Sequence, residues 1–356
     1  MSEMSSIDIR PILEQTTWDT FVLSLEQKTF LHSWNWIAMN RALGEEAVPL
    51  GAFQDGTLVG VALGLTVTAR RGSFLFCPHG PLVRGGMGQR AGGREVIERL
   101  LDALEREARK RKLSFLRVSP LLPDTPEGRR LFAERGYRPA PIHMHAETMW
   151  VLDVRPPEEE LLKHMRKTTR NLIHRGEREA VAIRLSADPK DLELFQRLYS
   201  ETAGRERFVP FSRAFLEAEF EAFRRDDRAF LAFATHNDEP LATALIVLYG
   251  DTAFYHQGAS SRARPKVPAA YLLHWKIIEE LKRRGITHYN FWGIAPRLPE
   301  AGSREPVSHP WAGLTLFKRG FGGERIDCLH AQDLPLRSSY WLTYGIEQAR
   351  RWKRGF

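Results

Sequence analysis

The order of strands and helices repeats in the two halves of this 356-residue chain, and that repeat limits the possible folds more than any other feature. Each half shows strands of alternating apolar residues, then a helix with apolar residues at helical spacing, then a further strand. The ranges are 46–67, 73–77, 94–112 and 112–120 in the first half, and 230–235, 241–249, 252–259, 269–285 and 288–293 in the second. Antiparallel strands ahead of the helix predict an α+β fold with two similar units and argue against a Rossmann fold.

A boundary between the two units is expected at residues 155–161. The sequence there, RPPEEEL, places two prolines and an acidic cluster ahead of a new helix. The strand predicted for residues 145–154 precedes this boundary and is therefore assigned to the first unit.

Composition and charge limit the classes of molecule that the protein is expected to bind. The chain is 43% hydrophobic and 27% charged, as in globular proteins, and its net charge of +8 favours an anionic partner such as nucleic acid, a phosphorylated substrate or acidic lipid headgroups. A generally arginine-rich composition is the alternative explanation. Cys77 and Cys328 show no metal-binding or disulfide spacing, which fits a reducing cytoplasm. We expect no signal peptide and no membrane-spanning segment.

The chain lacks the common motifs for covalent, metal-dependent or nucleotide chemistry. It contains no GxGxxG, Walker lysine loop, HExxH or GxSxG sequence. A mechanism that depends on positioning and charge stabilisation is therefore expected, with no metal and no cofactor.

A cationic stretch opens the second half. In residues 163–179, Lys163, Lys167 and Arg170 recur at helical spacing with Arg166 beside them, so one helix face is predicted to be strongly positive. Such a face suits phosphate contacts with RNA, because arginine binds phosphate through two parallel hydrogen bonds. A solvated surface helix is the alternative.

The loop before the second-half helix resembles the pyrophosphate-binding turn of acyl-CoA transferases with the GNAT fold by its position only. It reads RPKVPAA over residues 264–270, without the glycines of that turn, and Pro265 and Pro268 each remove a backbone donor. The topology thus suggests a GNAT-like fold, while the loop argues against coenzyme A. The prolines also fit ordinary punctuation at the start of a helix.

Three other segments carry candidate site residues. The paired Trp34 and Trp36 precede Arg41, although paired tryptophans are also common in cores. Arg205 lies in the arginine-rich segment TAGRERF. Near the C-terminus, FKRGFGG flanks Lys318 with Phe317 and Phe321 and follows it with glycines. A solvated lysine in a turn is the alternative to a catalytic one.

Taken together in this order, the motifs resemble the FemABX family, the non-ribosomal peptidyltransferases that build peptidoglycan cross-bridges. The matching stretches are TFLHSWNW at 29–36, PHGPLV at 78–83, MRKTTRNLIHRGERE at 165–179, ETAGRERF at 201–208, YHQGAS at 255–260, residues 268–294 and GLTLFKRGFGGE at 313–324. The chain has no long helical-hairpin insertion, so it is similar to the short, arm-less members.

The resemblance implies two GNAT-like domains, each a mixed sheet flanked by helices. The first would comprise residues 1–153 plus 331–356 and bind the acceptor, and the second, residues 154–330, would face the donor and carry the catalytic lysine. It also implies aminoacyl-tRNA as donor and a UDP-linked or lipid-linked muropeptide as acceptor. The protein would be a cytoplasmic monomer, peripheral at the inner face of the plasma membrane.

The resemblance also assigns roles to residues. Lys318 would neutralise the developing oxyanion or leaving oxygen, and Phe317 would position it. Arg41, Arg205 and Trp36 would bind the acceptor, the two arginines through its diphosphate. Tyr255 and Tyr271 would bind substrate in the cavity of the second domain. The tRNA would contact the cationic stretch at 163–170.

The chain departs from the family where an acidic residue is usual, since it has Ser119 before Pro120 and Asn290 in YNFWG. These departures weaken any carboxylate base and suggest a changed acceptor; the attacking amine would then lose its proton to substrate or solvent. Two alternatives remain: an acyltransferase of the same fold with acyl-CoA or another donor, and a non-catalytic module that binds RNA or a membrane surface.

Overall fold

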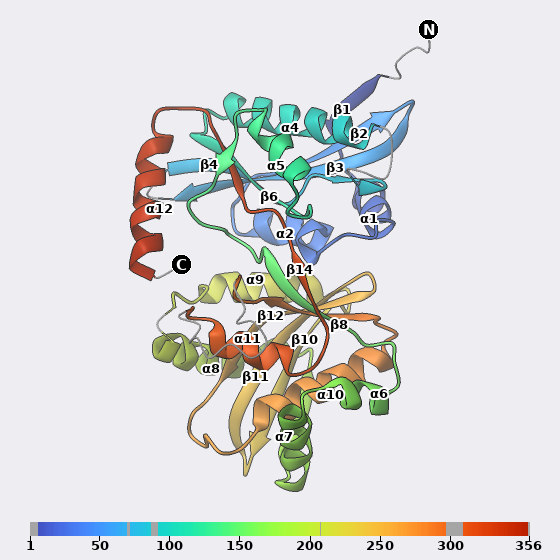
Figure 1. Ribbon diagram of the computed structural model, residues 1–356, viewed down its shortest axis with the longest axis vertical. Coiled ribbons are helices and arrows are strands. Elements are labelled where there is room, and N and C mark those ends of the chain that lie inside the picture. Colours follow the sequence, from blue (N-terminus) through green and yellow to red (C-terminus); the bar gives the residue numbers. More distant parts are fainter. Residues whose placement is uncertain (1–5, 70–71, 87–91, 207, 297–308, 355–356) are drawn as a thin grey trace. The chain divides into compact units, whose positions relative to one another are not determined.

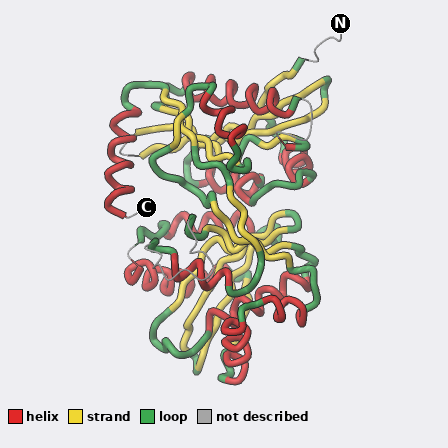
Figure 2. Tube along the Cα trace, viewed as in Figure 1, coloured by secondary structure: helices red, strands yellow, loops and turns green. Residues whose placement is uncertain are grey.

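The computed structural model describes residues 6–69, 72–86, 92–206, 208–296 and 309–354. The chain divides into two compact units, residues 1–147 with 327–356 (unit 1) and residues 148–326 (unit 2). Each unit is built around a mixed β-sheet with helices packed on it (Figures 1 and 2). The predicted α+β class with two similar units, each a mixed sheet flanked by helices, is confirmed.

Unit 1 contains a sheet in the order β1-β2-β3-β4-β6-β15-β7, with β5 paired to β3. Its strands are β1 Ile7–Pro11, β2 Ala47–Gln54, β3 Thr57–Ala69, β4 Gly72–His79, β5 Leu82–Val83, β6 Phe115–Pro120, β7 Arg138–Pro139 and β15 Gln332–Pro335. Its helices are α1 Gln15–Leu23, α2 Trp34–Ala42, α4 Gly93–Lys110, α5 Pro126–Ala133 and α12 Tyr340–Arg354, with a 3-10 turn at Phe30–His32.

The two faces of the unit 1 sheet follow the period-two alternation of its strands. Leu75 and Leu116 point into a core with the apolar side of α4, whereas Phe74 and Phe115 stack on the other face beside Tyr340 of α12. Arg117 shares this second face. Its guanidinium is buried and donates to Asp333 of β15 at 2.7 Å and to Glu347 of α12 at 2.7 Å, which ties the C-terminal segment to the centre of the sheet.

Unit 2 contains a sheet in the order β14-β8-β13-β12-β11-β10-β9. Its strands are β8 Thr148–Asp153, β9 Ala182–Ser186, β10 Ala229–His236, β11 Glu239–Tyr249, β12 Thr252–Ser260, β13 His288–Gly293 and β14 Glu324–Asp327. Its helices are α6 Glu158–His164, α7 Lys167–Arg178, α8 Leu192–Glu206, α9 Arg213–Arg224, α10 Ala269–Arg283 and α11 Ala312–Arg319, with a 3-10 turn at Pro189–Asp191.

The predicted domain boundaries differ from the structure at both ends of unit 2. Strand β8 was assigned to the first domain, but it pairs with β13 of unit 2, and β15 from the end of the chain pairs with β6 of unit 1. In unit 2 the antiparallel neighbour of β13 is therefore β8, which directly follows unit 1 in the chain. In unit 1 the antiparallel neighbour of β6 is β15, which directly follows unit 2. Sequence proximity to the first half therefore misplaced residues 148–153, and residues 327–330 were likewise assigned to the second domain although they belong to unit 1. The boundaries lie at 147/148 and 326/327.

The predicted continuous cationic helix is also corrected. The helical conformation is interrupted between α6 and α7 at Met165 and Arg166, whose ψ angles of 152° and 138° are not helical. Met165 turns into the core, and the Arg166 N–H donates to Gly320 O at 3.0 Å. In the described ranges, no helix is long and apolar enough to cross a membrane.

Candidate active site

Lys318 is buried inside unit 2. It lies in the last turn of α11, only 4% of its surface is exposed, and its Nζ donates to the carbonyl oxygen of Gly293 at 2.6 Å. The ammonium also lies 5.6 Å from the ring centroid of Tyr255. The alternative interpretation of Lys318 as a solvated lysine in a turn is therefore wrong, because the side chain points into the protein.

The two groups that hold Lys318 belong to two strands that separate. The parallel strands β12 and β13 pair through Thr252–His288, Ala253–Tyr289 and Phe254–Asn290, and after that they part. Tyr255 follows the last pair on β12, and Gly293 ends β13. Lys318 therefore bridges the open end of the two strands.

Unit 1 lacks a corresponding opening among its described residues. The equivalent parallel strands, β4 and β6, remain paired through six successive positions from Phe74–Phe115 to His79–Pro120. Of the two sheets, the one in unit 2 has the opening between its parallel strands. Unit 2 is therefore the candidate for the active site.

An aromatic cluster surrounds the lysine and excludes water. Phe317 is half-buried and packs edge-on against Tyr271 at 5.0 Å and His274 at 5.3 Å, and Phe321 is fully buried against the same group. This burial lowers the pKa of Lys318 to about 7, and no carboxylate among the described residues offsets the effect. Near neutral pH the amine is therefore poised between its charged and neutral forms.

The glycines after Lys318 allow close packing of the turn. A Cβ at Gly320 would overlap the hydroxyl of Thr169 on α7, and Gly323, at φ +98°, lies against the backbone of Val151. The Trp150 indole donates to Gly322 O at 2.6 Å. Gly258 of the YHQGAS motif is required for a similar reason, because the Tyr255 ring occupies the place of its side chain.

The structure gathers only some of the candidate residues around Lys318. Lys318, Phe317, Tyr255 and Tyr271 lie together. Arg205, at the end of α8, donates to Ser260 O at 2.7 Å and to Glu206 at 2.8 Å, so it is fixed to the end of β12. Its role in binding diphosphate stays a prediction.

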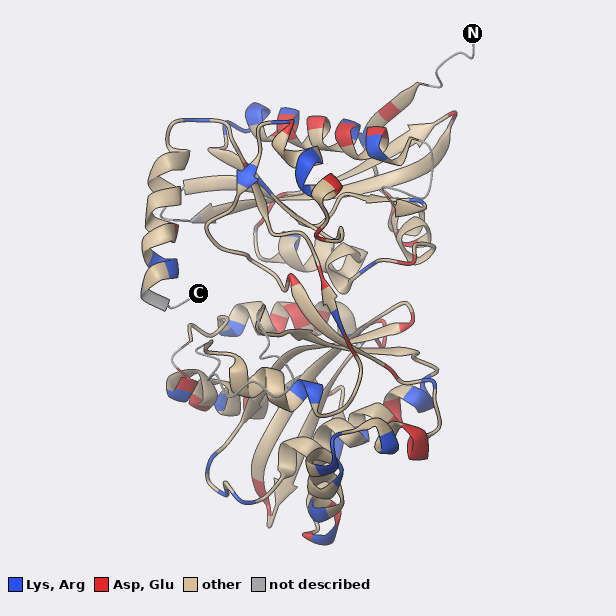
Figure 3. Cartoon of the chain, in the orientation of Figure 1, with Lys and Arg blue, Asp and Glu red and all other residues tan. Residues whose placement is uncertain are grey.

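The cationic residues divide between surface and structural positions. Lys163, Arg166 and Lys167 are exposed around the α6–α7 joint, and further basic residues recur along α7 (Figure 3). Arg170 is half-buried and donates to the carbonyl oxygens of Leu162 and Lys163 at 2.8 and 3.2 Å, which caps α6. Arg170 thus has a structural role whether or not it contacts RNA.

Trp36 and Arg41 belong to unit 1. Trp36 is 3% exposed and packs edge-on against Phe30 at 5.4 Å and His145 at 5.9 Å, as a core residue does. Arg41 is exposed and lies 5.5 Å from the Trp34 ring. The core alternative for the tryptophan pair therefore describes Trp36 better than substrate binding.

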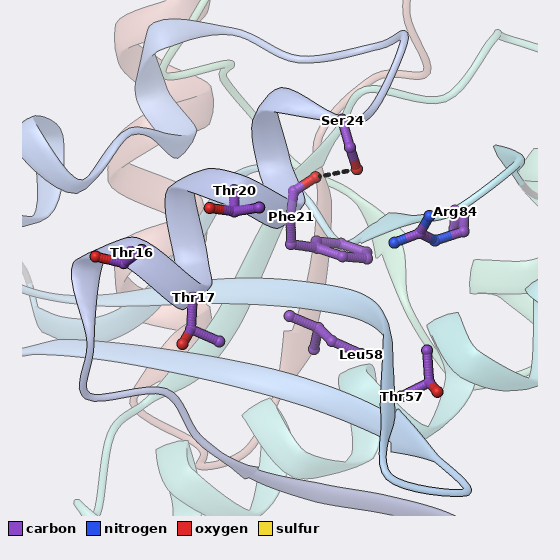
Figure 4. Close-up of a pocket in the computed structure, with 8 residues that line it drawn as sticks. All are labelled: Thr16, Thr17, Thr20, Phe21, Ser24, Thr57, Leu58 and Arg84. Carbon is purple, nitrogen blue, oxygen red and sulfur yellow. Dashed lines mark hydrogen bonds between the residues drawn. The ribbon is translucent and has the colours of Figure 1, made fainter.

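A hollow of about 370 Å³ in unit 1 is a separate feature (Figure 4). It is lined by residues of α1, among them Thr16, Thr17, Thr20 and Phe21, together with Thr57, Leu58 and Arg84, and the Ser24 hydroxyl donates to Phe21 O at 2.7 Å. The hollow is open and offers no group suited to covalent or proton-transfer chemistry, so no function is assigned to it.

Sequence reasoning missed a second polar group at the strand opening. His256 of β12 and Glu219 of α9 form a buried contact, with side chains 4% and 0% exposed. The histidine stood in the quoted YHQGAS motif, but its partner lies 37 residues earlier, and only the fold brings them together. Among the described residues, no group of acidic, histidine and cysteine side chains could hold a metal ion.

Comparison with known proteins agrees with this architecture. Residues 163–298 match the family model described as an acetyltransferase (GNAT) domain. The aminoacyltransferase FemA of Staphylococcus aureus is 23% identical over 108 residues, which cover 30% of this chain and 24% of FemA, so the match spans about a quarter of that curated relative.

Solved structures extend the likeness to the whole fold. A crystal structure of FemX has a TM-score of 0.78 at 17% identity and covers 96% of this chain and 100% of that one. A tandem GNAT protein from the clavulanic acid biosynthesis pathway has a TM-score of 0.56 at 12% identity, with 93% and 98% covered. The fold is therefore that of two tandem GNAT-like units, and residues 163–298 of unit 2 match an acetyltransferase (GNAT) domain. In its sequence motifs and in its fold the chain is similar to the FemABX proteins.

Proposed function

We propose that the protein transfers an amino acid from aminoacyl-tRNA to an amine of a peptidoglycan precursor peptide and so forms a cross-bridge peptide bond. The observation that carries this proposal is the position of Lys318, a buried amine at the open end of β12 and β13 in the unit that matches the acyltransferase family. The FemA and FemX likenesses supply the class of donor and acceptor.

The reaction replaces one bond to the acyl carbon with another. The acceptor amine attacks the ester carbonyl, a C–N bond forms, and the C–O bond to the tRNA ribose breaks. Lys318 in its ammonium form donates to the oxygen that gains negative charge, and in this dry site such a donor is worth about 10²–10³ in rate. Phe317 and Phe321 keep water from this donor and from the ester.

The turn between β12 and α10 favours tRNA over coenzyme A as the donor. Pro265 and Pro268 have no N–H, and the N–H groups of Ser261, Ala263 and Val267 already donate within the turn or to β11. A pyrophosphate would find few of the backbone donors that bind it in a glycine-rich turn. An acyl-CoA or another acyl donor is the second candidate, since the matched family model describes an acetyltransferase.

We assign supporting roles on the same basis. Lys163, Arg166 and Lys167 would contact tRNA phosphates, and Arg41 and Arg205 the acceptor diphosphate. We place the protein in the cytoplasm, peripheral to the inner membrane face. Support comes from α12, where Trp341, Leu342 and Trp352 are 52%, 68% and 88% exposed on one face and the single acidic side chain, Glu347, is buried against Arg117.

The test is a transfer assay with purified protein, a charged tRNA pool and UDP-linked or lipid-linked precursor. The precursor should gain the mass of one amino acid or more. Lys318→Met should lower kcat by about 10²-fold or more with little change in tRNA binding. Lys110→Met, which removes an exposed lysine of α4, is the matched control and should act like wild type. Turnover of acetyl-CoA with no product from any charged tRNA would refute the proposal.

A further inference from the structure

Both strands that form the opening carry an extra residue there. In β12, Leu245 pairs with Gln257 but Ile246 pairs with Tyr255, so His256 is the inserted residue of a β-bulge. In β13 the register shifts between Asn290 and Gly293, and Trp292 has φ +64°. A bulky residue in this conformation is strained, and bulges next to active sites redirect side chains.

The two inserted side chains meet on the sheet face covered by α9. The rings of His256 and Trp292 lie 5.8 Å apart in an edge-to-face arrangement, and Phe211 of the α8–α9 connection lies 6.4 Å from His256. On the other face, Lys318 bridges Tyr255 and Gly293, the next residues along the same two strands. A ligand between β12 and β13 would thus have Lys318 on one side and His256 on the other.

Glu219 fixes the orientation of His256. One carboxylate oxygen forms a short contact with His256 Nδ1, and the other, Oε2, is buried without a hydrogen-bond partner among the residues that the structure describes. With a neutral ring, Nδ1–H donates to the carboxylate and Nε2 carries the lone pair.

We propose that His256 is the proton acceptor for the attacking amine and that Glu219 is its positioning residue. The inference rests on the proposed function and supplies the base that the sequence did not reveal. As the C–N bond forms, the amine proton moves to His256 Nε2. As the C–O bond breaks, the leaving oxygen takes a proton from the Lys318 ammonium, and exchange with solvent then returns His256 and Lys318 to their starting forms.

The other histidine at this site is poorly suited to the same role. His274 of α10 lies on the lysine side, where its Nδ1 is 2.8 Å from the Tyr289 hydroxyl. Burial lowers the pKa of His274 to about 3, with the Lys318 charge acting in the same direction. An imidazole that resists protonation to this degree is a weak base.

Kinetic experiments on the full chain test the proposal. His256→Gln should lower kcat by about 10²–10³, with KM and tRNA binding within twofold of wild type. Glu219→Gln should have a smaller effect of the same kind. Added imidazole should restore at least tenfold to His256→Ala, a rescue that loss of a merely structural contact would not give. His174→Gln and Glu177→Gln are matched controls, since this exposed pair on α7 has the same residue types at 3.3 Å.

A spectroscopic measurement separates this inference from the proposed function. Nitrogen-15 NMR of histidine-labelled protein should show His256 with its proton on Nδ1 and a strongly deshielded proton that disappears in Glu219→Gln. A proton on Nε2 in the neutral ring, or wild-type kcat in His256→Gln, would overturn the proposal. If wild type transfers no amino acid from any charged tRNA, the proposed function fails, while the NMR result still decides the state of the pair.

Discussion

Burial of the Lys318 amine should lower the free energy of unfolding of the protein, and the size of this effect should depend on pH. The folded pKa is about 7 and the ordinary value is 10.5, so between these values the unfolded chain binds more protons than the folded protein. Stability therefore rises with pH across this window. Replacement with methionine, which has a similar shape and no charge, should abolish that contribution.

The magnitude follows from the pKa difference. One pKa unit corresponds to about 1.36 kcal/mol, so at pH 7 the buried amine costs on the order of 4 kcal/mol, and at pH 9 about 2 kcal/mol. Methionine cannot make the hydrogen bond to Gly293 O, so the variant loses roughly 1.5–3 kcal/mol of the gain from removing the charge. Lys318→Met should thus be at least as stable as wild type at pH 7, and its relative advantage should shrink by about 2 kcal/mol at pH 9.

Urea denaturation followed by circular dichroism at pH 6, 7, 8 and 9 measures this difference. The effect of the substitution on packing is the same at every pH, and all other titrating groups are the same in both proteins. Neither therefore contributes to the change with pH of the difference in free energy of unfolding between variant and wild type. Lys110→Met, in which an exposed lysine is removed, should give a curve parallel to wild type. A Lys318→Met curve that is also parallel to wild type from pH 6 to 9 would show that Lys318 titrates as a solvated amine, and the dry-site mechanism would fall.

Two further predictions concern unit 1. Arg117→Met should lower the free energy of unfolding by about 3–5 kcal/mol, because it leaves Asp333 and Glu347 buried without their cation; Arg155→Met, which breaks an exposed pair with Asp153, should cost less than about 1 kcal/mol. Equal losses in urea denaturation would contradict this account. In cosedimentation with vesicles, the double variant Leu342→Ser, Trp352→Ser should bind anionic lipid about tenfold more weakly or worse, since it removes exposed apolar surface from α12. Leu13→Ser, a substitution at another exposed leucine, is the control and should bind like wild type. This surface would be ruled out as a membrane contact if the wild type did not bind anionic vesicles. Binding of RNA or of a second copy of the chain through this surface would also rule it out.

Local sequence patterns were sufficient for most individual elements. The QDG hairpin, the second-half meander and the helix predicted at 269–285, which the structure places at Ala269–Arg283, could be predicted because apolar periodicity and turn residues act over a few neighbours. The same patterns failed at residues 163–179. There the break at Met165 and Arg166 depends on Gly320, which lies more than 150 residues away in the chain.

The sequence by itself determined the fold class, the order of elements and the identity of Lys318 as a candidate, because these follow from periodicity and from motifs that survive in one dimension. The tertiary structure decided which sheet received β8 and β15, since strand pairing is chosen by available edges and not by chain distance. It also decided the state of Lys318. A lysine beside glycines is ordinary in sequence, and it becomes a poised amine only where α11, β12 and β13 remove it from water. His256 acquires its partner in the same way, through the packing of α9 on the opened strands.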